Sequence, residues 1–232
     1  LAFVENELMD ADGGFLSALD ADSEGVEGKF YTWSSSEIIS LLQKSAPLFM
    51  AYYGVTEAGN WEHTNILHTP QPASAVAQQF GVSEKECLKT IQNCTSILMA
   101  ERNKRIRPQT DDKRLLGWNA LMNTAFSKAY AAIGNKNYLT RAQQNMAHLF
   151  KHFKNADEEG WFHTYKNGVA KTPAFLDDYA YLIEALIQLQ TVSGDLHWLE
   201  KAGAITAYVN DHFIESSTGF YFYTHDAQTD VI

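Results

Sequence analysis

The chain has 232 residues, of which 45% are hydrophobic and 20% are charged, proportions that are typical of a soluble globular protein. Its 28 acidic and 18 basic residues give a formal net charge of -10, which disfavours binding to nucleic acid or to an anionic membrane through the whole surface. No apolar run approaches the roughly 18 residues of a membrane span. We therefore predict a soluble protein with neither nucleic acid nor a membrane among its partners.

The two cysteines predict a cytoplasmic protein. Cys87 and Cys94 are seven residues apart on a predicted helix, so their Cα atoms lie about 10 Å apart, too far for a disulfide. Neither belongs to a Cys-x-x-Cys motif. They are interpreted as buried thiols, with a reactive role as the alternative.

The N-terminal region combines a short helix with a long loop. Apolar spacing predicts a helix over residues 1–9, and the glycine-rich segment 13–33 reads as a loop. Within that loop, alternation predicts a short strand over residues 29–33. A capping box from Ser34 to Glu37 then predicts a helix that begins near Ser35.

The next segments alternate between helix and loop. Residues 47–53 are predicted to form a short helix closed by Gly54, and residues 56–72 a polar and aromatic loop. A second capping box, Ser83 to Glu86, opens a longer helix that should end in a basic segment before Pro108.

Two helical hairpins are predicted in the C-terminal half. Apolar residues keep a 3.6-residue period over residues 118–130 and 138–153, and again over 173–189 and 195–213. Asn167-Gly168 predicts a tight turn between two short extended runs, and residues 216–224 read as an aromatic extended run. Such hairpins either stack into an open solenoid or close into an α/α toroid, and the spacing alone does not decide between them.

Several longer motifs point to one family. In order they are GGFLSALDADSEGVEGKFYTW, GNWEHTNIL, ERNKRIRPQTDDKRLLGWNALM, AFLDDYAYLIEALIQL and GFYFYT. Together they span essentially the whole chain, which resembles the thioredoxin-domain-containing family related to spermatogenesis-associated protein 20.

The resemblance implies an architecture. Members of this family carry an N-terminal thioredoxin-like domain followed by a six-hairpin α/α toroid similar to glycoside hydrolases and N-acylglucosamine 2-epimerases. We therefore expect residues 1–232 to form a single all-α domain, an incomplete six-hairpin glycosidase-like toroid with short β-hairpins in its rim loops. The thioredoxin-like domain and the last hairpins are expected to lie outside this chain. Exposed helix faces of an open ring predict self-association of the fragment.

Four acidic residues are the predicted catalytic groups: Asp177, Asp178, Asp20 and Asp22. Carboxylates at the start of a helix, as at Asp177 and Asp178, are also explained by the helix dipole. Glycoside hydrolysis needs two carboxyl groups, about 5 to 5.5 Å apart for retention and about 6.5 to 9.5 Å for inversion. Asp177 or Asp178, together with an acid from the segment 20–27, could supply the two carboxyl groups, but the sequence does not give the distance between them.

The acidic segment also imitates a calcium loop. Asp20, Asp22 and Glu24 are spaced like the start of an EF-hand, but Tyr31 stands at position twelve, where a bidentate Glu is needed. Solvated or backbone-capping acids and ligand-facing carboxylates are the alternatives. We predict neither a metal site nor a cofactor.

A further set of aromatic, polar and charged residues is predicted to bind substrate. Aromatic faces stack on sugar rings and amides bond to hydroxyl groups, although aromatic residues at helical spacing are often core residues. An Arg fork suits a carboxylate or phosphate, with internal pairing as its alternative. The predicted set is Glu24, Glu27, Tyr31, Trp33, Trp61, Asn65, Arg105, Trp118, Asn119 and Tyr179.

The histidines give weaker signals. His148 and His152 share a helix face at i, i+4, a spacing that zinc sites use, but the sequence shows no third ligand beside them. An epimerase needs one or two histidines as acid/base groups, and His63 and His163 are the candidates in rim segments.

Two functional hypotheses follow. The first is a carbohydrate-active domain, glycosidase-like or sugar-epimerase-like, that acts on a small carbohydrate ligand in a central cavity. The alternative is a non-catalytic binding or scaffold domain that accompanies the thioredoxin-like domain. An enzyme should present two converging titratable groups, whereas a scaffold should present a pocket or apolar groove without such a pair.

Overall fold

The computed structural model describes residues 1–155 and 160–228, and its contacts divide the chain into two compact units. Unit 1 comprises Leu1–Ala18 and Thr110–Ile232, and unit 2 comprises Leu19–Gln109. The organisation of residues 1–232 as a single domain stays a prediction.

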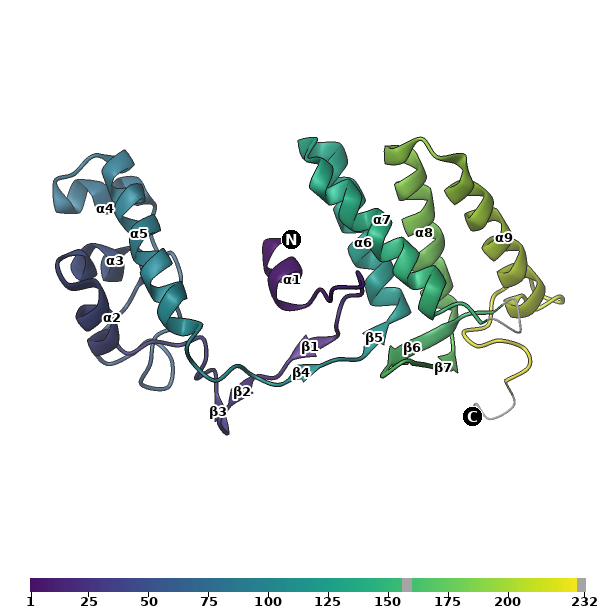
Figure 1. The fold of residues 1–232 in the computed structure, drawn as a ribbon, viewed down its shortest axis with the longest axis horizontal. Coiled ribbons are helices and arrows are strands. Elements are labelled where there is room, and N and C mark those ends of the chain that lie inside the picture. Colours follow the sequence, from purple (N-terminus) through teal and green to yellow (C-terminus); the bar gives the residue numbers. More distant parts are fainter. Residues whose placement is uncertain (156–159, 229–232) are drawn as a thin grey trace. The chain divides into compact units, whose positions relative to one another are not determined.

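Unit 1 is built mainly from two antiparallel helix pairs. Its helices are α1 (Ala2–Glu7), α6 (Leu116–Ile133), α7 (Lys136–His152), α8 (Leu176–Ser193) and α9 (Leu196–Phe213). The last four lie side by side (Figure 1), with α6 packed on α7 and α8, and α8 packed on α9. Their apolar stripes meet in a core that includes the fully buried Phe126, Met146 and Leu186. The helices predicted for this region are confirmed.

The two helix pairs turn through the same kind of corner. Helix α6 ends at Gly134, with φ +73°, and the side chain of Asn135 then accepts the amide N–H of Asn137 at the start of α7. Helix α8 ends at Gly194, also with φ +73°, and Asp195 caps α9 in the same way. A left-handed glycine and a capping side chain therefore occupy adjacent positions at each corner.

A three-stranded antiparallel sheet completes unit 1. Its strands are β5 (Arg114–Leu115), β6 (Phe162–Lys166) and β7 (Val169–Pro173), in the order β5-β6-β7. Lys166 pairs with Val169 across the turn, where Asn167 and Gly168 both have positive φ. The predicted Asn-Gly hairpin is confirmed.

Unit 2 contains four α-helices among its residues, all of which the structure describes. They are α2 (Ser35–Leu42), α3 (Ala46–Tyr53), α4 (Ala73–Phe80) and α5 (Glu84–Arg102), with a 3-10 turn, η1 (Gln43–Ser45), after α2. Both predicted capping boxes are present, at Ser34 and at Ser83. Elsewhere the short strands pair as β1 (Ala18–Leu19) with β4 (Thr110–Asp111) and β2 (Asp22–Ser23) with β3 (Val26–Glu27).

Two predicted extended segments differ from the prediction. Residues 29–31 form a turn, because the carbonyl of Gly28 accepts the amides of Tyr31 and Thr32 at 2.8 and 3.0 Å. Of residues 216–224, residues 216–218 form a turn, and the extended pairing is limited to Phe220–Phe222, which bond to the backbone of residues 213 and 215 around the Ile214–Tyr221 bridge.

One helix was not predicted. Helix α4 follows Pro72, which supplies no side-chain cap, and ends at the left-handed Gly81. Its buried residues are Val76 and Ala77, too few to create a clear period in the sequence.

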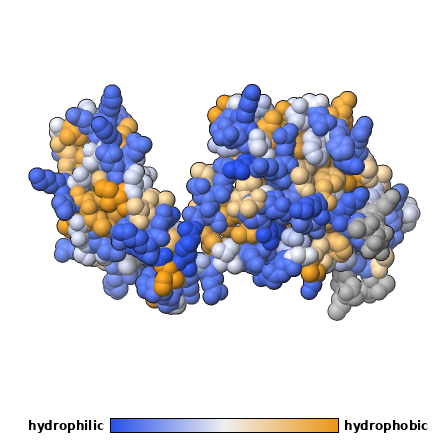
Figure 2. Space-filling model, in the orientation of Figure 1, coloured by the Kyte–Doolittle hydropathy of each residue, from blue (hydrophilic) through white to orange (hydrophobic). Residues whose placement is uncertain are grey.

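The predicted fold class, all-α with helical hairpins and short β-hairpins in the loops, is confirmed. Among the described residues, no helix is both long and apolar enough to cross a membrane. Figure 2 shows apolar surface on each unit, and the exposed apolar side chains include Trp118, Ile133 and Leu196 in unit 1 and Ile39 and Leu88 in unit 2. Self-association of the chain stays a prediction.

Candidate functional site

The carboxylate of Asp178 is the centre of a buried polar network in unit 1. Its Oδ1 accepts the amide N–H of Gly117 at 2.9 Å, and its Oδ2 accepts the amide N–H of Phe175 at 3.0 Å. Oδ2 also lies 2.7 Å from Nδ1 of His163 on β6. One side chain therefore connects the start of α6, the start of α8 and the sheet.

This environment changes the acidity of Asp178. Burial raises the pKa of its carboxyl, while the Phe175 amide and the neighbouring His163 oppose that rise. The imidazole of His163 is partly exposed, with 28% of its side-chain surface accessible, so the pair has one buried and one accessible member. In the part of the chain that the structure describes, Nε2 of His163 has no hydrogen-bond partner.

Three other predicted residues lie on the same helix starts. Asp177 is half-buried and accepts the amide of Asp178 at 3.0 Å. Trp118 is 56% exposed and follows Gly117 directly. Tyr179 is buried, and its hydroxyl accepts the amide of Trp161 at 3.0 Å. Asp177 and Trp118 are therefore accessible, whereas Tyr179 is part of the core.

Asn119 is a buried clamp on α6. Its Oδ1 accepts the amide of Phe15 at 2.8 Å, and its Nδ2 donates to the carbonyls of Phe15 and Leu115 at 3.0 and 2.9 Å. Asn145 adds a fourth bond, to Oδ1 at 3.0 Å. These contacts give Asn119 a structural function in unit 1.

The predicted acidic loop residues lie in unit 2 and are exposed. Asp22 pairs with Glu27 across the β2-β3 hairpin, and Asp20 accepts the amide of Asp22 at 3.3 Å. Glu24 forms an ion pair with Lys29 at 2.7 Å. The carboxylates of Asp20 and Glu24 therefore have local partners.

Arg105 lines a pocket of about 440 Å³ in unit 2 that also contains Glu24. Its Nη1 donates to the carbonyls of residues 29, 30 and 32 at 3.1, 3.0 and 2.7 Å, and its Nη2 donates to Glu37 at 3.1 Å. The guanidinium carbon lies 3.9 Å from the centroid of the Trp33 ring. Internal pairing, the alternative raised for this Arg, is thus observed.

The remaining predicted residues surround the same loops. Asn65 is buried and bonds with Thr56 and the carbonyl of Trp33, while Trp33 itself is core. Trp61 is half-buried, and its indole packs against Gly28. A Cβ atom at that position would lie only 2.9 Å from the indole. Tyr31 lines an apolar pocket of about 270 Å³.

The structure thus brings Asp178 into contact with His163 in unit 1, while Asp177 and Trp118 are chain neighbours of Asp178 and of Gly117, to which Asp178 bonds. In unit 2 it brings Glu24 and Arg105 to one pocket. The predicted pairing of Asp177 or Asp178 with an acid of the segment 20–27 stays a prediction. His63, the other histidine candidate, is exposed in unit 2 with φ +65°.

Two groups among the described residues have the donor atoms and spacing for a metal ion: Asp12 with His148 and His152, and His212 with His225 and Asp226. The His148–His152 spacing is visible in the sequence, whereas Asp12 is 136 residues away from His148 in the chain. Only a tertiary contact identifies it. The prediction of no metal site stays untested.

No family model matches the chain. Among curated proteins, human spermatogenesis-associated protein 20 is 28% identical over 257 residues, which cover 96% of this chain and 33% of that protein. An uncharacterized protein from Caenorhabditis elegans is 32% identical over 221 residues, covering 82% of this chain and 30% of that protein.

The solved structures similar to this chain include a cellobiose 2-epimerase from Bacillus thermoamylovorans, with 12% identity and a TM-score of 0.48 over 97% of this chain and 56% of that one. An α-mannanase from Bacteroides thetaiotaomicron has 14% identity and a TM-score of 0.44, over 84% of this chain and 63% of that one.

The curated relatives confirm the resemblance that the sequence motifs indicate. The rat protein of the same name is 29% identical and matches 96% of this chain. The chain spans about a third of the length of the curated relatives it matches. Over 96% of its length the chain is thus similar to spermatogenesis-associated protein 20 from human and from rat.

Proposed function

We propose that unit 1 carries an acid/base site of the sugar-epimerase type, in which His163 exchanges a proton with a carbohydrate. The observation that supports this proposal best is the 2.7 Å contact between Nδ1 of His163 and the buried carboxylate of Asp178. A carboxylate in that position accepts the Nδ1 proton, fixes the tautomer and leaves the Nε2 lone pair as a base.

Asp178 is a positioning residue in this proposal. Its two oxygens already accept two backbone amides and the imidazole, so it holds His163 rather than contacting substrate. Epimerisation next to a carbonyl needs one group that removes a proton and another that returns a proton to the opposite face. His163 takes the first role, and the half-buried Asp177 takes the second.

Trp118 is the residue that would bind the sugar ring in this proposal. Its side chain is 56% exposed, although its neighbours Gly117 and Asn119 are buried. An exposed indole is a platform on which the apolar face of a sugar ring can stack. The amide of Gly117, one residue away, bonds to the carboxylate that holds His163.

The same geometry disfavours a role for Asp178 as the general acid of a glycosidase. A general acid must give its proton to a leaving group, whereas the oxygens of Asp178 accept three donors inside the protein. The histidine chemistry therefore agrees better with the site than a carboxylate pair that includes Asp178.

The test is deuterium exchange at carbon 2 of aldoses and cellobiose, followed by NMR in D₂O with the intact protein. We expect exchange and a new epimer with the wild type and loss of both with His163→Gln. His197→Gln, which changes an exposed histidine of the same unit, is the matched control. A folded wild-type protein that binds no sugar and exchanges no proton would disprove this function.

A second candidate function is non-catalytic binding, and the apolar pocket of unit 2 favours it. Aromatic and aliphatic side chains, including Tyr31, Phe49, Leu98 and Met99, line its volume of about 270 Å³. Such a pocket suits an apolar segment of a client that is presented to a thioredoxin-like domain. Met99→Glu should abolish client binding and leave sugar exchange unchanged, which separates the two functions. We keep cytoplasmic location as part of this proposal.

A further inference from the structure

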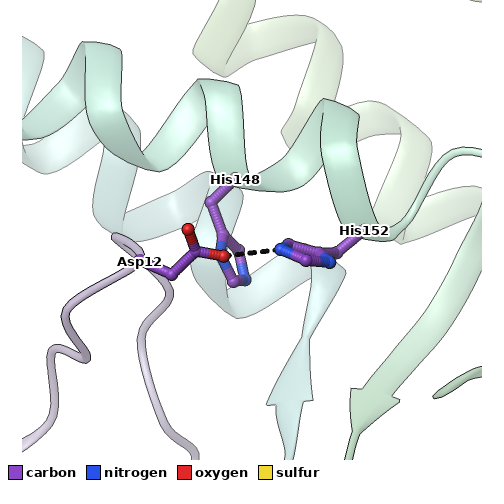
Figure 3. A group of neighbouring side chains, drawn as sticks. All are labelled: Asp12, His148 and His152. Atoms are coloured by element: carbon purple, nitrogen blue, oxygen red, sulfur yellow. Dashed lines mark hydrogen bonds and ion pairs between the residues drawn. The ribbon is translucent and has the colours of Figure 1, made fainter. Parts of the chain in front are cut away.

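The side chains of Asp12, His148 and His152 form a compact three-residue cluster in unit 1 (Figure 3). Nε2 of His152 lies 2.6 Å from Oδ2 of Asp12, and Nδ1 of His148 lies 3.4 Å from the same oxygen. One donor atom from each residue falls within 4.8 Å of the others. The two histidines follow one another by one helical turn on α7, and Asp12 lies in the turn after α1.

His148 supplies an independent observation. Its side chain is only 1% exposed, and neither ring nitrogen has a hydrogen-bond partner among the described residues. The 3.4 Å contact with Asp12 lacks hydrogen-bond geometry. Buried polar atoms are normally paired, since leaving one unpaired costs about 1–3 kcal/mol. The Nδ1 atom faces the Asp12 carboxylate, so a cation between them would satisfy it.

We propose that Asp12, His148 and His152 bind a zinc ion. Two imidazole nitrogens and one carboxylate oxygen form a donor set that suits zinc better than the all-oxygen preference of Mg²⁺ or Ca²⁺. Zinc lies about 2.0–2.2 Å from such donors, which places the donors about 3.3 Å apart in a tetrahedron. Rotation of the exposed Asp12 carboxylate opens its contact with His152 to that distance.

The surrounding charges are compatible with a divalent cation. Lys151 lies 3.3 Å from Asp12 and competes for its carboxylate, but its ammonium is on a long, exposed side chain. Arg114 also lies near His148, and its charge is neutralised by an ion pair with Asp10. The aromatic ring of Tyr165 packs 4.5 Å from His152 and covers one side of the cluster.

The ion would connect two parts of unit 1 that are distant in sequence. Asp12 belongs to the N-terminal segment, whose Phe15 packs in the core of unit 1 and whose Glu5 pairs with Arg141. Zinc binding should add a direct link between residue 12 and α7. Three protein ligands leave a fourth position, which a water molecule takes in many zinc sites.

The experiment is titration of the intact, tag-free protein with Zn²⁺ against a competing chelator, with Co²⁺ absorption as a second readout. We expect zinc to raise Tm and Co²⁺ to give tetrahedral d–d bands. Asp12→Asn and His152→Gln should each weaken zinc binding by more than about tenfold, and both preserve the buried His148.

Two matched variants make the result specific. Lys151→Gln removes the competing ammonium and should bind zinc at least as tightly as the wild type. His225→Gln alters the second group of potential ligands, near the end of the described chain, and should leave the cobalt bands of the first site intact. Equal zinc affinity in wild type, Asp12→Asn and His152→Gln would overturn the proposal, as would a zinc site lost only in His225→Gln.

Discussion

Nδ1 of His163 lies 2.7 Å from Oδ2 of Asp178, and the same carboxylate accepts the amides of Gly117 in the first turn of α6 and of Phe175, which caps α8. A single buried acid thus supports both the fold of unit 1 and the orientation of an accessible imidazole. Replacement of Asp178 should therefore affect both the stability of unit 1 and the position of this imidazole.

Asp178→Asn should destabilise unit 1 by about 2–4 kcal/mol at neutral pH. The amide group of Asn places its own N–H donors against at least one of the backbone donors that Asp178 now accepts. Urea unfolding measures the free-energy difference. Asp177→Asn is the control, with an expected loss below about 1 kcal/mol, and equal losses in the two variants would contradict this account of Asp178.

The pH dependence of that difference has a definite sign. Burial raises the pKa of Asp178 above its ordinary value of 3.8, so the folded state binds this proton more tightly than the unfolded state. Its contribution to stability is present below the unfolded pKa and is lost as pH rises through the folded pKa. The stability advantage of wild type over Asp178→Asn should therefore shrink as the pH rises above about 4, the ordinary pKa of an Asp carboxyl, as followed by urea unfolding. A gap that widens with pH would show a lowered pKa instead.

Asn119→Ala should cost about 2–4 kcal/mol, because it leaves the backbone groups of Phe15 without their partners inside the protein. Loss of the amide protection of Phe15 in hydrogen exchange would locate the effect. Asn137→Ala changes an exposed residue of α7 and should stay within about 0.5 kcal/mol of the wild type. A comparable stability of the two variants would refute a clamp at Asn119.

Arg105→Lys should loosen the turn at residues 29–32, since an ammonium cannot reproduce the planar fork that donates to three carbonyls and to Glu37. Faster amide exchange at Tyr31 and Thr32 is the measurement. Lys104→Ala removes a neighbouring exposed cation and should leave these amides unchanged. Unaltered protection in Arg105→Lys would mean that the turn holds without the fork.

Cys87 and Cys94 should react slowly with a disulfide reagent in the native protein. Burial raises the pKa of both thiols, and Glu84 adds to the effect at Cys87, so little thiolate is present at neutral pH. We expect a rate at least about tenfold below that in urea. Fast native labelling of either residue would revive the reactive alternative.

Helix boundaries were predictable where the signal is local. Ser34 and Ser83 start helices with the partners that a capping box specifies, and Gly54 ends α3 at the predicted place. Helix α4 lacks such a cap, and the turn after Gly28 is stabilised by backbone bonds and by Arg105, which is 73 residues away from Thr32 in the chain. Those elements were missed for that reason.

The candidate site was predictable only in part. Asp178 and His163 were both identified by residue type, but their contact joins a helix to a strand and has no sequence period. Asn65, Asn119 and Arg105 were predicted to contact a ligand because they are polar residues within motifs, and the structure also gives each of them structural bonds. A polar residue within a motif can contact a ligand or hold the fold together, and the sequence alone does not distinguish these two roles.

The corners at Gly134-Asn135 and Gly194-Asp195 bear on how such a protein changes over evolutionary time. The glycine that ends one helix stands next to the residue that caps the start of the following helix. Each corner therefore contains a C-cap and an N-cap in two adjacent positions. A single inserted residue would separate stop from start and rotate the second helix out of register with the first. Gain or loss of a whole hairpin, by contrast, brings or removes both signals together. Lengthening by duplication of hairpins is therefore the change that this architecture accommodates most readily.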